Sequence, residues 1–196
     1  KEGALDDFNR LLNFVSSNQI TEEDYQSVLK EWIDVDAFMD HIILKSYLGY
    51  SELTVNNKAW RSHDKGKWNW LSFDMEHGFG CCGSDLSTKN TLEKYLESTL
   101  SQHPYVIFRE LFKVDAFKKE FLQRYNLYLE TVLSKDHVIE VIDSLSENIQ
   151  SEIFPHLQRW RPTFDFSDWV EEVDALRSYA IERTPAMKSM IKDYLS

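Results

Sequence analysis

The sequence predicts a mainly helical fold with one inserted β-hairpin, and three observations favour it. Glycine and proline are scarce, at 6 and 4 of 196 residues, which disfavours turn-rich sandwiches and barrels. Apolar residues recur three or four positions apart over most of the chain, as in helices that bury one face. Residues 60–62 and 68–74 are aromatic and partly alternate with polar residues, as strands do. A chain of this length suits one domain, so residues 1–196 are expected to belong to a single domain.

Three helices are expected before the hairpin. Residues 4–16 place leucine, phenylalanine and valine on one helical face. Thr21 precedes a run of acidic residues and is the predicted N-cap of a second helix, which ends near Trp32. Asp34 is the predicted N-cap of a third helix, which Gly49 is expected to end.

The hairpin is expected to have its strands at 60–62 and 68–74. Residues 63–67, His-Asp-Lys-Gly-Lys, have the composition of a turn between the strands. The side chains of Trp68 and Trp70 are interpreted as hairpin core rather than as a stacking platform for a ligand.

The rest of the chain is expected to be helical. The expected ranges are 88–100, 103–134 with a break near Lys113, 135–160, 168–183 and a last helix from Thr184. Pro155 is expected to kink or end the helix in which it lies, because proline lacks a backbone N–H. Ser167 is the predicted N-cap of the next helix, and Thr184 with Pro185 has the pattern of an N-cap and first helical residue. Trp160, which lies between two arginines, is expected to be buried.

The charge of the chain limits its partners. There are 33 acidic and 22 basic residues, which give a formal net charge of −11. Such a surface repels phosphate backbones, so no nucleic-acid partner is expected. Nucleotide binding in a small pocket remains compatible with this charge, because a bound metal ion reverses the local sign. No apolar run approaches the roughly 20 residues of a membrane span, so no span is expected in this chain.

Polar residues gather where regular structure is expected to end. Glu52 and Asn57 follow the third expected helix, and Asp74 ends the second expected strand. In protein kinases a catalytic aspartate is followed five positions later by a metal-binding asparagine, and a second metal-binding aspartate follows a short hairpin. Glu52 and Asn57 are also five positions apart, although this spacing alone is a weak signal. An acid at the end of an aromatic strand is costly to bury without a partner, which favours a ligand role for Asp74.

Two longer motifs surround these residues. GYSELTVNNKAW is similar to an N-x-D…N-N element, and GKWNWLSFDMEHGFG to a Trp-rich strand that ends in D-x-D-x-(G)-F-G. Together they resemble the signature of the spore coat protein H (CotH) kinase family, and the similarity extends from about Val35 to Tyr194 through FKKEFLQRY and HLQRW. The resemblance implies an atypical kinase fold that phosphorylates protein serine or threonine with ATP and Mg²⁺ or Mn²⁺.

The resemblance implies a role for each candidate residue. Glu52 falls on the catalytic-loop aspartate, and Asn57 on the asparagine that binds the metal and, with it, the nucleotide. Asp74 and Glu76 fall on the two acids of D-x-D, which makes them the other implied metal ligands. Glu52 and Glu76 are each one methylene longer than the family's residue, and Tyr50 stands where the family often has asparagine. Displacement of a catalytic oxygen by about 1 Å can cost ~100-fold in rate, so the activity implied for this variant is reduced.

The resemblance also implies partners and a location. The chain corresponds to the helical C-terminal lobe, and the nucleotide-binding N-terminal lobe, its own partner, is expected upstream of Lys1. These residues alone are therefore expected to be inactive. The implied substrate is a protein at a bacterial cell surface or spore coat, outside the cell. The alternative is a pseudokinase-like binding or scaffold module that keeps the fold without turnover.

Overall fold

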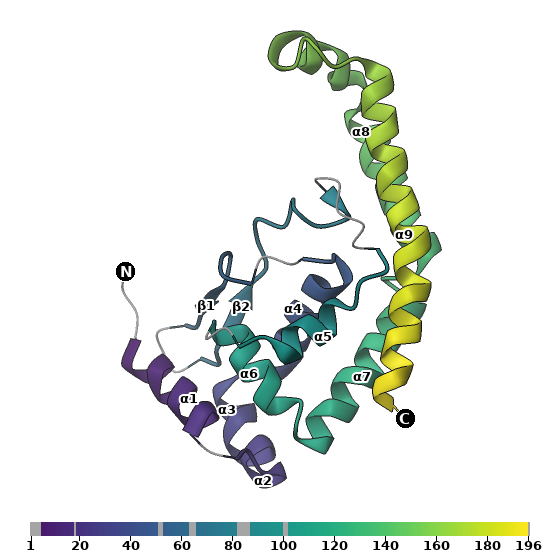
Figure 1. Cartoon of the computed structure of the whole chain (residues 1–196). Helices are drawn as coiled ribbons and strands as arrows, with labels where there is room; N and C mark the ends of the chain where they lie inside the picture. Colours follow the sequence, from purple (N-terminus) through teal and green to yellow (C-terminus); the bar gives the residue numbers. More distant parts are fainter. Residues whose placement is uncertain are drawn as a thin grey trace. The chain divides into compact units, whose positions relative to one another are not determined.

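The computed structural model describes residues 5–17, 19–50, 53–62, 66–81, 87–99 and 102–195. Within these ranges the chain is mainly helical and its strands form one hairpin (Figure 1), which confirms the predicted fold class. The chain divides into two compact units. The first comprises Lys1–Gly78 and Asn90–Tyr125, and the second comprises Phe79–Lys89 and Asn126–Ser196.

The first unit begins with helices whose ends agree with the predicted caps. The elements are α1 (Leu5–Ser17), α2 (Glu22–Asp24), the π-helical turn η1 (Tyr25–Leu29), α3 (Lys30–Trp32) and α4 (Val35–Tyr47). The Thr21 side chain accepts a hydrogen bond from the Asp24 N–H at 3.1 Å, and the Thr21 N–H donates to the Asp24 carboxylate at 2.9 Å. Asp34 accepts from the Ala37 N–H at 3.2 Å. Gly49 leaves the last helix with a φ of 70°, which a glycine adopts at little cost.

The hairpin is present close to the predicted position, but its first strand begins two residues earlier than predicted and its second ends three residues before Asp74. Strand β1 (Lys58–Trp60) pairs antiparallel with β2 (Asn69–Leu71). Residues 63–65 of the predicted turn lie outside the described residues. The Trp68 N–H donates to the backbone oxygen of Trp32 at 2.8 Å, and its oxygen accepts from the Asp34 N–H at 3.0 Å. These bonds hold the hairpin at the start of α4. Trp68 and Trp70 are buried, as predicted.

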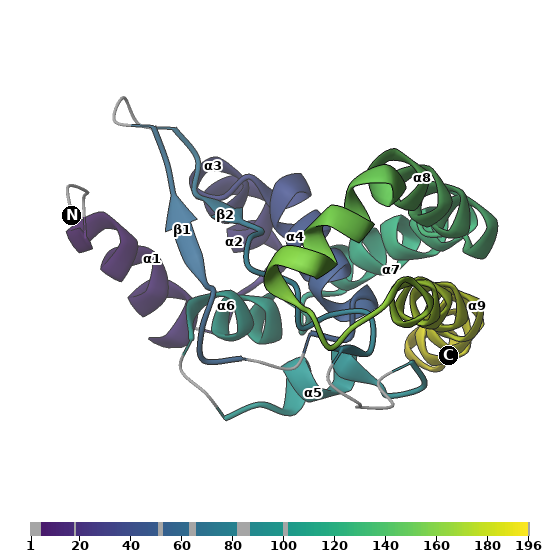
Figure 2. The same ribbon diagram turned by 90° about the horizontal axis from the view of Figure 1, so that it is seen from above.

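Three further helices follow the hairpin. They are α5 (Thr91–Glu97), α6 (His103–Leu111) and α7 (Asp115–Glu130), so the predicted break near Lys113 is confirmed. Figure 2 shows α6 beside α1, with which it is in contact. The rings of Phe108 and Phe121 pack 5.0 Å apart between centroids, at the centre of an aromatic core.

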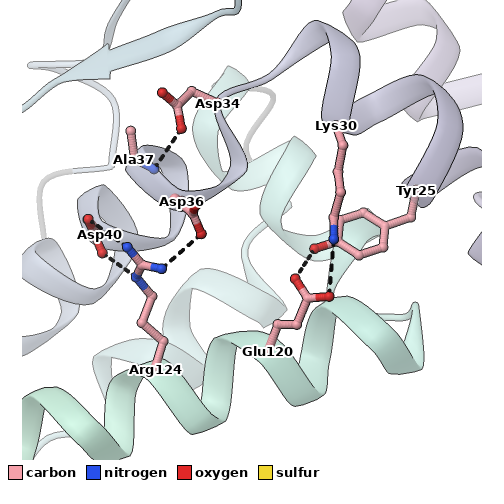
Figure 3. Close-up of polar contacts among 8 residues, drawn as sticks. All are labelled: Tyr25, Lys30, Asp34, Asp36, Ala37, Asp40, Glu120 and Arg124. Carbon is pink, nitrogen blue, oxygen red and sulfur yellow. Dashed lines mark hydrogen bonds and ion pairs between the residues drawn. The ribbon is translucent and has the colours of Figure 1, made fainter.

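Polar side chains also connect α7 to the earlier helices (Figure 3). Arg124 donates to the Asp40 carboxylate on α4 at 2.6 Å. Glu120 accepts from the Tyr25 hydroxyl at 2.6 Å and from Lys30 Nζ at 3.2 Å. The hydrophobic core is therefore closed on this side by charged hydrogen bonds, which fix how α7 lies against α4 and η1.

The second unit contains two long helices, α8 (Lys135–Trp160) and α9 (Phe166–Leu195), which pack side by side (Figure 1). Pro155 was expected to kink or end its helix. Helix α8 does not end there but continues for five more residues, to Trp160. Pro155 removes one hydrogen bond near the end of the helix, whereas the buried side chain of Leu157 keeps the last turn packed.

Helix α9 replaces the two helices predicted for the C-terminus, so that prediction was wrong. Asp165, rather than Ser167, caps its start by accepting from the Ser167 N–H at 2.7 Å. The Thr184 hydroxyl donates to the backbone oxygen of Leu133 at 2.9 Å instead of capping a new helix. A contact with a distant segment therefore occupies the expected capping group, and the helix runs through Pro185.

Several large apolar side chains of the second unit are exposed. Trp160 is 64% exposed at the end of α8, with the Arg159 guanidinium 4.8 Å from its ring centroid, so the prediction that it is buried was wrong. Val141, Leu145 and Ile149, four positions apart on α8, are exposed too. No helix in the described ranges is long and apolar enough to cross a membrane.

Candidate functional site

The loop after α4 and the segment after β2 are joined by the side chain of Asn56. Its Nδ2 donates to the backbone oxygen of Asp74 at 3.2 Å and to the Tyr50 hydroxyl at 2.8 Å. Asn56 and Asp74 both have left-handed backbone conformations, with φ of 57° and 56°. Asparagine and aspartate tolerate this region better than other non-glycine residues, and such strain collects at functional sites. The residue next to Asn57 is thus in contact with Asp74.

Asn57 is held from three directions. Its Oδ1 accepts from Lys45 Nζ at 2.8 Å, and its Nδ2 donates to the backbone oxygen of Leu53 at 3.0 Å. His103 forms a hydrogen bond with its backbone. Because an ammonium only donates and a carbonyl oxygen only accepts, the amide has one orientation in this setting. One lone pair of Oδ1 remains for a further ligand.

Lys45 is the residue of this site that the sequence analysis missed. Its side chain is completely buried, with Nζ 3.2 Å from the Tyr105 hydroxyl and 4.8 Å from the centre of the Tyr50 ring. No carboxylate of the described residues forms an ion pair with it, and burial lowers the pKa of Lys45 to about 8. The sequence did contain a signal, because Phe38, Ile42 and Lys45 share one helical face.

A buried histidine, His41, and a half-buried one, His103, lie close to this lysine. The Trp70 indole N–H donates to His103 Nδ1 at 2.9 Å, whereas His41 Nε2 is buried and has no partner among the described residues. Burial, and then the charge of Lys45, lowers the pKa of His41 to about 3. Burial lowers the pKa of His103 to about 4, against the effect of its backbone hydrogen bond. Both imidazoles are therefore neutral at neutral pH, and Lys45 carries the charge of the cluster.

Tyr50 anchors the loop at the position where the family often has asparagine. Its ring is buried, and its backbone oxygen accepts from the Tyr95 hydroxyl at 2.6 Å. Its own hydroxyl accepts from Asn56. The tyrosine thus anchors the loop through its buried ring, while its hydroxyl still reaches Asn56.

The candidate acids lie on the surface. The Asp74 side chain is exposed, so the cost of burying an acid gives no support to its expected role as a ligand, which stays a prediction. Strand β2 ends at Leu71, three residues before Asp74. Among the residues the structure describes, no donor bonds to its carboxylate. The Glu76 side chain is exposed as well, 4.0 Å from His77 Nε2. Glu52, the predicted catalytic residue, lies outside the described residues.

These groups suit a particular kind of cation site. The amide oxygen of Asn57 and the carboxylate of Asp74 are hard oxygen donors, as Mg²⁺ requires. In nucleotide sites Mg²⁺ uses one or two such protein ligands and completes its shell with phosphates and water. The described ranges contain no group of three or more His, Cys, Asp or Glu residues that could hold a metal ion. Asn57 and Asp74 could therefore supply one or two protein ligands to such a cation.

A family model matches most of the chain. The family model described as CotH kinase protein matches residues 1–187, a range that includes Glu52, Asn57, Asp74 and Glu76. The match confirms the predicted resemblance. It begins upstream of Val35, the residue from which the motifs indicated similarity. No curated protein and no solved structure matches the chain.

Proposed function

The chain belongs to the CotH kinase family, and on that basis we propose that it carries the metal-binding half of a phosphoryl-transfer site. The proposed reaction is phosphorylation of serine or threonine in a protein, with ATP and Mg²⁺ or Mn²⁺. The family match supports a kinase-like domain. The observation that carries the finer proposal is the hydrogen bond from Asn56 to Asp74, because it puts two oxygen donors on adjoining loops.

Each residue has a role in this proposal. Asn57 and Asp74 hold the cation, with Glu76 as a second acid nearby. When bound, the cation neutralises charge on the transferring phosphoryl group. Lys45 and His103 keep the Asn57 side chain and backbone in place, so no rotamer search is needed on binding. Glu52 orients the acceptor hydroxyl and accepts its proton, as the resemblance implies. The N-terminal lobe supplies the remaining phosphate contacts.

A binding or scaffold module without turnover is the second candidate. The glutamate at position 52 and the ammonium already bonded to Asn57 both count against efficient transfer. The exposed apolar residues Val141, Leu145 and Ile149 on α8 are of the kind that a protein partner covers. The two candidates differ in one measurable property, the transfer of phosphate.

The test is transfer of labelled phosphate from ATP to a serine-rich acceptor by the full-length protein, with Mg²⁺ or Mn²⁺. We expect slow turnover by the wild type and none by Asp74→Ala, which lacks a metal ligand. Glu52→Asp should be faster by up to ~100-fold, since the shorter arm restores the family's carboxylate position. Glu31→Ala removes an exposed acid on α3, away from the site, and should keep the wild-type rate.

One pattern of results rejects the enzyme and leaves the binding module. In that pattern neither wild type nor Asp74→Ala transfers phosphate, and Glu52→Asp does not restore transfer. Equal rates for wild type and Asp74→Ala would instead show that transfer occurs elsewhere.

A further inference from the structure

A lysine is buried behind the candidate metal ligand, and no acid among the residues that the structure describes balances its charge. Lys45 donates to Asn57 Oδ1 at 2.8 Å and to the backbone oxygen of Asn56 at 3.4 Å. Within the described ranges its other contacts are with neutral groups, namely the Tyr105 hydroxyl and the faces of the Tyr50 and Tyr105 rings. Burying a charge in this way is costly, and hydrogen bonds and ring faces offset the cost only in part.

The amide oxygen of Asn57 is therefore already bonded to a positive charge. A divalent ion on its other lone pair would share this oxygen with the ammonium. Two cations a few ångströms apart repel each other, and Asp74 supplies only one compensating negative charge. Nucleotide phosphates bring the further negative charge that such a site needs.

We propose that Lys45 is a built-in cation that shares the Asn57 oxygen with the incoming metal, so that the site accepts metal only together with nucleotide phosphates. This inference rests on the proposed function, since it concerns the same metal site. It assigns Lys45 two effects. The lysine orients the Asn57 amide, and its charge prevents the site from filling with free metal.

A merely structural lysine has different consequences. It would support the fold, and its removal would leave metal affinity unchanged or lower it through disorder of Asn57. A built-in cation weakens the binding of free metal, so its removal strengthens that binding. The direction of the change in metal affinity separates the two roles.

The experiment measures Mn²⁺ binding at pH 7 from the loss of the free-ion electron paramagnetic resonance signal. Full-length protein is titrated with Mn²⁺ alone and with Mn²⁺ plus a non-hydrolysable ATP analogue. We expect wild type to bind Mn²⁺ weakly alone and at least ~10-fold more tightly with the analogue. Lys45→Met should bind Mn²⁺ alone at least ~10-fold more tightly than wild type.

Two further variants show whether the gain acts through Asn57. Lys45→Met combined with Asn57→Ala should lose the gain, because the shared oxygen is absent. Ser46→Ala is the matched control, since Ser46 is the next residue on α4, is buried and bonds to the Tyr125 hydroxyl at 2.8 Å. It should bind Mn²⁺ as wild type does. Lys45→Gln, a second neutral variant, replaces Lys45→Met if circular dichroism shows that the latter is unfolded.

The outcomes distinguish this inference from the proposed function. If Lys45→Met and Lys45→Gln bind Mn²⁺ alone no more tightly than wild type, the inference is overturned. If Asp74→Ala abolishes binding of Mn²⁺ with the analogue in the same experiment, the proposed metal site survives that result. If Asp74→Ala leaves that binding intact, the proposed metal site itself fails.

Discussion

Replacing Lys45 by methionine should remove a specific dependence of stability on alkaline pH. Methionine has nearly the same length and keeps the packing of α4, but it carries no proton to lose. The side chain of Lys45 is fully buried, and its pKa is lowered from 10.5 to about 8. Between these two values the unfolded chain binds a proton at this residue and the folded chain does not. The free energy of unfolding of the wild type therefore rises with pH in this window.

The magnitude follows from the size of the shift. Each pH unit in the window adds about 1.4 kcal/mol, so the rise from pH 8 to 9.5 is about 2 kcal/mol. Tyr105 sets the upper end of the useful pH range. Burial raises the pKa of its hydroxyl, so above about pH 10 this hydroxyl loses its proton in the unfolded chain before it does in the folded chain. At pH 7 Lys45→Met gains stability because it buries no charge. This gain is largely offset by the loss of the hydrogen bonds to Asn57 and Tyr105, each worth about 1 kcal/mol.

The assay is urea unfolding of wild type and Lys45→Met at several pH values from 7 to 9.5. Amide hydrogen exchange in α4 measures the stability of the first unit separately from that of the second. All other titrating groups are common to the two proteins, so the difference between their unfolding free energies isolates Lys45. We expect this difference to shift by about 2 kcal/mol in favour of wild type between pH 8 and 9.5. Parallel pH profiles would refute the assignment of a buried, uncompensated charge.

Three further outcomes are expected. Between pH 6.5 and 5 the first unit should lose about 2 kcal/mol of stability for each of His41 and His103, because the unfolded chain binds protons at these residues and the folded chain, in which their pKa values are lowered, does not. Urea unfolding measures this loss, and a His41→Gln variant that loses as much as wild type would contradict it. Arg124→Met should cost about 1 kcal/mol, with less effect in 1 M salt because the ion pair with Asp40 is partly exposed, and a double-mutant cycle with Asp40→Asn measures the pair. Asn56→Gly should retain the fold, since glycine accepts the positive φ, but should weaken binding of Mn²⁺ with an ATP analogue about tenfold, and unchanged binding would show that the bridge to Asp74 does not matter.

Local signals predicted much of the fold. Thr21 and Asp34 cap helices with bonds to N–H groups three positions away, so the sequence alone contains both partners. The same reasoning failed at Thr184, because its hydroxyl bonds to Leu133, 51 positions away. A capping group is predictable only when no distant acceptor competes for it.

The sequence predicted the order of the candidate site residues but not the buried lysine that holds Asn57. Order along the chain placed Asn57 and Asp74 on neighbouring loops, and the bond from Asn56 to Asp74 agrees with that expectation. Lys45 was overlooked because lysine is seldom buried without an acidic partner. Its position on the apolar face of α4 was visible in the sequence, but its partners, Tyr105 and Asn57, come from separate parts of the chain.

The most direct test of the account locates the metal itself. Crystals of the full-length protein with Mn²⁺ and a non-hydrolysable ATP analogue would show the ion by its anomalous scattering. The account predicts one peak that is coordinated by Asn57 Oδ1, the Asp74 carboxylate and phosphate oxygens, with Lys45 still bonded to Asn57. A bound nucleotide whose metal contacts neither Asn57 nor Asp74 would contradict the account.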